Sequence, residues 1–435
     1  MSKQDTKQLL SFIEQSPTAF HAVESATKIL KEQGFIPLPE GESWSLEAGK
    51  GYYVTRNQSS IIAFRVPTEK PTAFMISASH TDSPTFKLKN EYESPAFGKY
   101  VRLNVEPYGG TIFASWMDRP LSLAGRVILN QKGNFLAKTV KIDRDLLLIP
   151  SVAIHMNRNV NSGASYNAAV DMLPLFTQTD DSTATLKGLL AKELECAEDE
   201  ICGMDLYLYN RTPGSLWGAK EEFFSVPRID NLMCMFGTLQ GFLQATPTTA
   251  IPVCFAADNE ETGSATKQGA GSVFLSDVLS RICEALGVDK RCLLASSMMV
   301  SADNGHAKHP NHPEFSDAQN APHLNGGVVI KTNAAQRYTT DGISAALFAE
   351  ICRRAGVPVQ QFANRSDVPG GSTLGSISNT RVPLITVDIG MAQLAMHSSY
   401  ETAGTKDIGY LTAAMTAFYN STLQALGDGC YRLQP

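Results

Sequence analysis

Acidic and histidine residues follow several apolar segments of this sequence, at the point where each segment ends. In ASHTDSP an apolar run leads to His80 and Asp82, and in QLAMHSSYE another leads to His397. In open α/β sheets, ligands bind at the carboxyl ends of strands, so residues at strand ends converge even when they are far apart in the chain. Four further carboxylates occupy comparable positions: Asp230 in VPRIDNL, Glu260 and Glu261 in AADNEETGS, and Asp303 in VSADNGHA.

Each member of this set also has an ordinary structural interpretation. A histidine such as His80 on an apolar strand is commonly a core residue, and Asp230 before a helix suits an N-cap. Glu260 and Glu261 suit a solvated turn. The prediction of a functional site therefore depends on the whole set and not on any single residue.

The set supplies the ligands that two neighbouring divalent ions need. Oxygen and imidazole ligands without thiolates suit zinc, manganese or cobalt in a hydrolytic site. His80, Asp303 and a bridging Asp230 would hold one ion. Glu261, His397 and the same Asp230 would hold the other.

Two more residues would assist this centre. Glu260 is adjacent to a ligand and free to act as the general base on an attacking water. Asp82 lies two residues after His80, on the same side of an extended chain, where it can accept the second imidazole N–H. The chemistry predicted by these residue types is metal-assisted hydrolysis.

Composition excludes several classes of protein. The 435 residues include 37 Lys plus Arg against 43 Asp plus Glu, a net charge of −6, which gives no electrostatic footprint for nucleic acid or an anionic membrane. No apolar run reaches the ~18 residues that a spanning helix needs, and MSKQDTKQLLSFIEQ does not have the pattern of a signal peptide. The eight cysteines form no CxxC pair, which favours reduced structural thiols and a cytoplasmic location.

Apolar periodicity predicts the elements that position the set. Helices are expected over 5–14 and 18–33, and strands over 61–66 and 73–79, the latter leading directly to His80. From Asn90 to Pro227 the sequence is rich in turns and short β-like runs. We therefore predict an α/β domain, residues 1–90 plus 228–435, that is split by a β-rich insertion, residues 91–227. In its second half we expect helices over 231–244, 272–286, 341–355 and 409–426, and strands over 252–257, 298–302, 327–331 and 383–389.

Longer motifs run from about residue 80 to residue 400: ASHTDSP, YGGTIFASWMDRPLSLAGRV, AIHMNR, RIDNL, DNEETGS, SADNGHAKHPNHPE, KTNAAQRY and AMHSSYE. In order and spacing they resemble the aspartyl aminopeptidase family of cocatalytic metallopeptidases. The resemblance implies a mixed central sheet flanked by helices, with the ligands and base named above and two divalent ions per subunit, zinc being expected. It implies release of N-terminal Asp or Glu from peptides. It also implies that the insertion mediates dimerisation and that dimers build a homododecamer.

Two residues gain a role only through this resemblance. His155 in AIHMNR matches a histidine that, in the family, reaches the active site of the neighbouring subunit and contacts substrate there. Lys331 in VVIKTNAAQRY is similar to the family's candidate for receiving the acidic side chain of the substrate. The alternatives are a buried histidine beside Ile154 and Met156, and an ordinary solvated lysine.

Some positions depart from the family's pattern. Members often have Met-Ala where this chain has Asn304 and Gly305, and an aliphatic residue in place of Thr262. None of these positions supplies a ligand, but they could line the substrate pocket, and related members prefer neutral N-terminal residues. The alternatives are therefore an aminopeptidase for neutral residues, an N-acyl amino acid deacylase with the same centre, and a non-catalytic assembly protein of the same fold.

Two other motifs are interpreted as loops. The prolines of HAKHPNH, which carries His306, His309 and His312, exclude a regular helix, so we expect a loop beside Asp303. VPGGSTLGS lacks the Gly-Lys-Ser/Thr of a P-loop and is interpreted as a turn near the substrate pocket.

Overall fold

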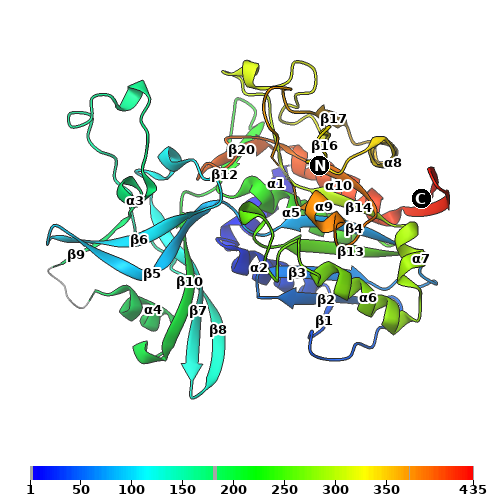
Figure 1. The fold of residues 1–435 in the computed structure, drawn as a ribbon, viewed down its shortest axis with the longest axis horizontal. Coiled ribbons are helices and arrows are strands. Elements are labelled where there is room, and N and C mark those ends of the chain that lie inside the picture. The colour runs from blue at the N-terminus through cyan, green and yellow to red at the C-terminus, as the bar shows by residue number, and fades with distance from the viewer. Residues whose placement is uncertain (1–2, 180–183, 372, 435) are drawn as a thin grey trace.

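The computed structural model describes residues 3–179, 184–371 and 373–434, which form two lobes built on separate sheets (Figure 1). The larger lobe contains a nine-stranded sheet and both described ends of the chain. Across this sheet the strands are β1 (Ile36–Pro37), β2 (Gly51–Arg56), β3 (Ser60–Arg65), β13 (Ala250–Ala257), β4 (Ala73–His80), β14 (Met298–Ala302), β18 (Ile385–Gly390), β16 (Val328–Lys331) and β17 (Val359–Phe362).

The nine-stranded sheet is mixed and buried on both faces. β13, β4, β14 and β18 are parallel neighbours, whereas β3 and β16 pair with this block in antiparallel fashion. Along β13, Cys254 and Ala256 face one hydrophobic core, while Val253 and Phe255 face the other. This double burial explains why the central strands are unbroken apolar runs. The predicted α/β class, a mixed central sheet flanked by helices, is confirmed.

Helices cover the two faces of this sheet. The first core contains residues of α1 (Lys3–Gln15), α2 (Ala19–Glu32), α5 (Ile229–Gln244), α8 (Gly342–Arg354) and α10 (Asp407–Asn420). The second contains residues of α6 (Phe274–Leu286), α7 (Lys290–Ala295) and α9 (Leu374–Asn379).

The smaller lobe is an antiparallel sheet with a core of its own. In order, its strands are β8 (Asn134–Lys141), β7 (Leu121–Gln131), β10 (Ile201–Asn210), β5 (Thr85–Ala96), β6 (Tyr100–Tyr108) and β9 (Leu175–Gln178). Leu123, Leu206 and Leu190 belong to this core, the last from α4 (Leu186–Leu194); α3 (Ala168–Asp171) is a single short turn. The sheet begins before residue 91 and ends well before residue 227.

A third sheet joins segments that lie far apart in the sequence. In order across this sheet, the strands are β11 (Ser215–Trp217), β12 (Phe223–Val226), β20 (Glu401–Gly404), β19 (Ala392–Leu394) and β15 (Gly305–His306). The last residues before Pro227 therefore pair with strands of the larger lobe rather than with the inserted sheet.

The predicted helix over 409–426 is wrong at its end. α10 stops at Asn420, and β21 (Thr422–Gly427) forms a hairpin with β22 (Cys430–Gln434). Gly427 and Gly429, which have positive φ in this turn, allow the chain to reverse, and the hairpin buries Leu423. Most other predicted elements lie within a few residues of the observed ones, and β4 is the predicted run extended by His80.

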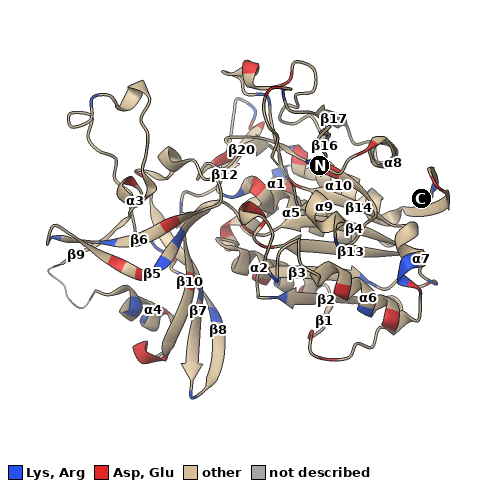
Figure 2. Cartoon of the chain, viewed as in Figure 1, with Lys and Arg blue, Asp and Glu red and all other residues tan. Residues whose placement is uncertain are grey.

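Acidic and basic residues are interspersed along the chain of both lobes (Figure 2). Among the described residues, the structure has no helix with the length and apolarity needed to cross a bilayer. All eight cysteines are free thiols, and Cys234 and Cys254 are buried, as expected for small core residues.

Candidate metal centre

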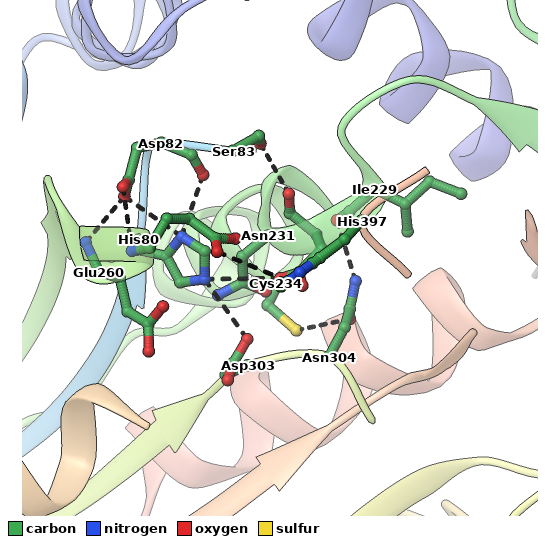
Figure 3. Close-up of polar contacts among 12 residues, drawn as sticks. His80, Asp82, Ser83, Ile229, Asn231, Cys234, Glu260, Asp303, Asn304 and His397 are labelled. Carbon is green, nitrogen blue, oxygen red and sulfur yellow. Dashed lines mark hydrogen bonds and ion pairs between the residues drawn. The ribbon is translucent and has the colours of Figure 1, made fainter. Parts of the chain in front are cut away.

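Neighbouring parallel strands bring four of the predicted residues to one edge of the large sheet (Figure 3). His80 is the last residue of β4, and Asp303 directly follows β14, the next strand across. Glu260 and Glu261 lie in a short 3-10 turn after β13, on the other side of β4. The side chain of Glu261 is only 5% exposed, so the solvated-turn interpretation is wrong for it.

Two other elements supply Asp230 and His397. Asp230 lies at the start of α5, where its backbone departs from helical geometry and the Asp230–Asn231 peptide is cis. The N-cap position belongs to Arg228, and the Asp230 carboxylate faces His80 and His397 instead. The N-cap interpretation of Asp230 is therefore wrong. His397 precedes β20 and has a positive φ of 68°.

The ligand atoms are spaced as they would be around metal ions. His80 Nε2 lies 3.5 Å from Asp230 Oδ1 and 3.4 Å from Asp303 Oδ1. His397 Nε2 lies 3.4 Å from Asp230 Oδ2 and 3.5 Å from Glu261 Oε2. Ligands ~2.1 Å from a tetrahedral zinc ion are separated by roughly 3.4 Å, whereas good hydrogen bonds of nitrogen to oxygen are shorter.

The buried Asp230 Oδ1 is a polar atom with no hydrogen-bond partner among the described residues. Such an atom is costly unless something else binds it, and a cation is the partner that suits a carboxylate oxygen. Three groups of side chains can hold an ion: His80 with Asp230 and Asp303, Asp230 with Glu261 and His397, and His80 with Glu260 and Glu261. The residues present therefore fit a metal site.

The Asp82 carboxylate organises the turn that carries the two glutamates (Figure 3). It accepts hydrogen bonds from the backbone N–H groups of Glu260 and Glu261, both at 3.2 Å, and from Tyr108 Oη at 2.7 Å. His80 Nδ1 lies 3.0 Å from the Asp82 carbonyl oxygen and 3.4 Å from its carboxylate. Asp82 thus acts on His80 chiefly through its backbone, and Nε2 remains free for a metal.

The inserted lobe reaches this centre within the same chain. His397 Nδ1 lies 2.9 Å from the carbonyl oxygen of Gly110, which only accepts, so Nδ1 carries the proton and Nε2 faces the cluster. Gly109, with φ of +71°, passes so close that a Cβ there would lie 3.0 Å from Glu261 Cβ. The segment after β6 therefore forms part of the wall of the site.

The protonation equilibria of the cluster indicate an excess of negative charge. Burial raises the pKa of Glu260 to about 8, and burial together with the Asp230 carboxylate raises the pKa of Glu261 well above its usual value. Burial alone would lower the pKa of His397, but the hydrogen bond to Asp230 and the charge of Glu261 raise it to about 10. Bound cations would supply the positive charge that these groups otherwise take from protons.

Lys331 lies in the same pocket and is 2% exposed, so it is not a solvated lysine. Its Nζ donates to the carbonyl oxygens of Asp303 and Asn304, at 2.7 and 3.1 Å, and lies 3.4 Å from Asp303 Oδ2. The pocket has a volume of about 150 Å³, and its wall also includes the following residues: His306, Tyr338, Phe362, Thr373 and Met396.

His155 is exposed in the loop that precedes α3, on the inserted lobe and outside the pocket of this chain. Its neighbours Ile154 and Met156 are 48% and 83% exposed, so the buried-histidine interpretation is wrong.

Several contributors were not predicted from the sequence. Tyr108 and Gly110 belong to the quoted motif YGGTI, but nothing in their types marks them as partners of Asp82 and His397. Glu401 follows His397 in HSSYE and accepts hydrogen bonds from the backbone N–H groups of Asp230 and His397. Glu401 stands out because it is a buried carboxylate, 1% exposed, and the structure shows this burial whereas the sequence does not.

The chain is similar in sequence and fold to several known proteins. The family model described as "Aminopeptidase I zinc metalloprotease (M18)" matches residues 12–419. A "Probable M18 family aminopeptidase 2" of Clostridium novyi is 44% identical over 423 residues, which cover 95% of this chain and 98% of that protein. A chain of the Ape4 and Nbr1 complex superposes with a TM-score of 0.93 at 37% identity, covering 96% of this chain and 86% of that chain. The S. cerevisiae mApe1 dodecamer gives 0.84 at 28% identity, with 95% of each chain covered.

Proposed function

The chain belongs to the M18 family of zinc metalloaminopeptidases, and from this premise we propose that it releases acidic N-terminal residues from peptides at a centre of two divalent ions. The observation that carries the proposal is the pair of donor groups that share Asp230. His80 and Asp303 complete one group, and Glu261 and His397 complete the other. Zinc suits this nitrogen and oxygen donor set, and manganese or cobalt would also be accepted.

The chain's own residues divide the work of amide hydrolysis. When bound, the ions supply Lewis acidity and lower the pKa of water. Glu260 belongs to neither of the groups that share Asp230, so we assign it as the general base. It takes a proton from the attacking water and returns one to the leaving amine. Asp82 and Gly110 hold His80 and His397 in the orientation that ligation requires.

Lys331 supports the preference for Asp or Glu at the N-terminus. It places a buried ammonium group in the wall of the pocket that contains the metal ligands. In the described structure Lys331 Nζ donates to Asp303 and Asn304. Its positive charge would therefore attract the acidic side chain of the substrate from the pocket wall. Replacement by Met should lower kcat/KM for Asp-p-nitroanilide more than for Leu-p-nitroanilide. Equal losses of kcat/KM for both substrates would indicate that Lys331 holds Asp303 in place and does not determine the substrate preference.

Self-association would complete the site. We propose that dimers assemble into a dodecamer, as in the mApe1 structure, and that His155 enters the active site of a neighbouring subunit. The exposed apolar side chains around it suit an interface: Val152, Ile154, Met156 and Val170. There His155 would donate to the oxyanion, a contribution of ~10² to 10³ in rate. His155→Ala should retain its metal and assembly but lose turnover, and unchanged turnover would remove His155 from the mechanism.

We also propose a cytoplasmic location, which the eight free thiols favour. The experiment that tests the function is hydrolysis of Asp-, Glu-, Leu- and Ala-p-nitroanilides and of N-acetyl amino acids. Each substrate is assayed before chelation, after chelation and after zinc is restored. Chelator-sensitive cleavage that favours Asp or Glu is the expected result.

Each of the other outcomes of this substrate assay would indicate a different function. Preference for Leu or Ala would retain the metal centre and contradict the acidic specificity. Hydrolysis of the N-acetyl amino acids alone would indicate a deacylase. No hydrolysis by metal-loaded, assembled protein would indicate a non-catalytic assembly protein.

A further inference from the structure

A chain of buried polar side chains lies behind the metal-ligand cluster and has no part in the chemistry assigned above. Its members are Asn304, Gln393 and Glu401, which are 3%, 1% and 1% exposed. Asn304 follows the ligand Asp303, and Gln393 lies in β19, four residues before His397. Burying three such groups costs free energy unless each is hydrogen-bonded, so their partners define what the chain does.

Glu401 joins two metal ligands through their backbones. Its Oε2 accepts from the N–H of Asp230 at 3.0 Å, and its Oε1 accepts from the N–H of His397 at 2.8 Å. Asp230 belongs to the start of α5 and His397 to the segment before β20, so these bonds fix one segment against the other.

Gln393 and Asn304 extend the connection to the third ligand-bearing segment. Gln393 Nε2 donates to Glu401 Oε1 at 3.2 Å, and Asn304 Nδ2 donates to Gln393 Oε1 at 2.8 Å. Asn304 Nδ2 also donates to the carbonyl oxygen of Ile229, the residue before Asp230, at 2.9 Å. One hydrogen-bonded path therefore connects the backbones that carry Asp303, Asp230 and His397.

The direction of this path is set by the carboxylate. Both oxygens of Glu401 already accept from backbone N–H groups, so Gln393 donates to Glu401 and turns its own oxygen toward Asn304. Asn304 in turn donates to Gln393 and accepts from Cys234 Sγ, which lies 3.1 Å from its Oδ1. Each amide thus has one satisfactory orientation, and the path is rigid rather than adaptable.

We propose that Asn304, Gln393 and Glu401 form a positioning network that sets the separation of the two metal-ligand groups sharing Asp230. The three are positioning residues that act through the backbones of Asp230, Asp303 and His397. This inference rests on the proposed dinuclear centre, and it identifies the residues that fix the positions of the ligands in that centre. Partners of this kind typically contribute ~10- to 100-fold in metal affinity when they are lost.

Glu401→Gln is the most specific perturbation because it preserves the shape of the side chain and replaces one acceptor oxygen by a donor NH2 group. If the remaining oxygen accepts from His397 and Gln393, the new amide group faces the N–H of Asp230, donor against donor. If it is flipped, it opposes His397 instead. Either orientation displaces a segment that carries a metal ligand, so zinc affinity should fall by about tenfold or more.

Asp407→Asn is the matched control. Asp407 is another fully buried carboxylate that accepts from two backbone N–H groups, those of Asn325 at 2.7 Å and Gly327 at 3.4 Å. These partners lie outside the metal-ligand segments. Both substitutions should lower the thermal stability of the metal-free protein, but Asp407→Asn should leave its zinc affinity within twofold of the original value.

The measurement is zinc binding to the chelated full-length protein, by competition with a chromogenic chelator, for the wild-type chain and both variants. The expected result is weakened binding in Glu401→Gln alone. Unchanged affinity in Glu401→Gln, or an equal loss in Asp407→Asn, would overturn the network while the metal centre of the wild-type chain stands. Wild-type protein that binds no zinc would overturn the proposed centre and the network with it.

Gln393→Met provides a second variant should Glu401→Gln fail to fold. It keeps the length of the side chain and removes only the link between Glu401 and Asn304. We expect a smaller loss of zinc affinity, about threefold to tenfold, with the bonds of Glu401 to Asp230 and His397 retained. Affinity equal to that of the wild-type chain would contradict the role given to Gln393 and Asn304.

Discussion

Replacing Asp82 with Asn should weaken zinc binding and turnover without unfolding the protein. The carboxylate accepts from the backbone N–H groups of Glu260 and Glu261 and from Tyr108 Oη. Asn has the same shape but one acceptor oxygen, and its amide group must occupy the other position. A hydroxyl such as that of Tyr108 can rotate to accept, whereas a backbone N–H cannot.

The magnitude follows from counting what is left unpaired. With the Asn oxygen directed to Glu260, the N–H of Glu261 faces a donor; with the side chain flipped, the N–H of Glu260 loses its acceptor. One buried N–H without a partner costs about 1 to 3 kcal/mol, which corresponds to about 5- to 150-fold in affinity if the cost falls on the ligand-bearing turn.

The assay is zinc affinity by chelator competition, followed by kcat and KM on Asp-p-nitroanilide with zinc in excess. Thermal melting of the zinc-free protein serves as the control, since a variant that melts near the wild type has kept its fold. Zinc affinity and kcat within twofold of the wild-type values would refute the role assigned to Asp82.

The remaining predictions concern the base, the metal and acid stability. Glu260→Gln should bind zinc within a few-fold of the wild-type affinity but lose ~10² to 10⁴ in kcat; comparable losses in both would make Glu260 a ligand instead of a base. Zinc at ~100 times its dissociation constant should stabilise the chelated protein by about 2.7 kcal/mol against unfolding, measured by denaturant titration, and no shift would argue against a folded-state metal site. Burial, with the charges of Lys141 and Arg228, lowers the pKa of His21 from 6.5 to about 4, so the folded protein keeps it neutral while the unfolded chain takes up a proton. This contribution to stability is present above about pH 6.5 and is lost as the pH falls toward 4, a change of about 3 kcal/mol. His21→Gln should remove it, and equal acid dependence of the unfolding free energy in both proteins would contradict this pKa.

The positions of the ligand candidates were predictable because strand ends carry a simple signal. β4 is an apolar run with a polar residue at its end, and the same pattern precedes Asp303. Parallel strands place such ends at one edge, so the sequence alone indicates a common site for His80, Asp303 and the glutamates after β13. Their roles as ligands remain a prediction that metal binding must test.

Contacts made through the backbone could not be predicted. Gly110 acts through its carbonyl oxygen on His397, and Glu401 acts on the backbone N–H groups of Asp230 and His397. Such contacts depend on how the two lobes and the third sheet meet, and no residue type or spacing encodes them. The hairpin after Asn420 cannot be predicted for a related reason. The apolar Leu423 suits a helix as well as a strand, and only its pairing with β22 in the folded chain decides between them.

The central claim is that two ions share Asp230. Anomalous diffraction from crystals of the zinc-loaded protein, recorded on both sides of the zinc absorption edge, tests it most directly. The account predicts two peaks in each subunit, one among His80, Asp230 and Asp303 and the other among Asp230, Glu261 and His397. A single peak, or zinc bound away from Asp230, would contradict it.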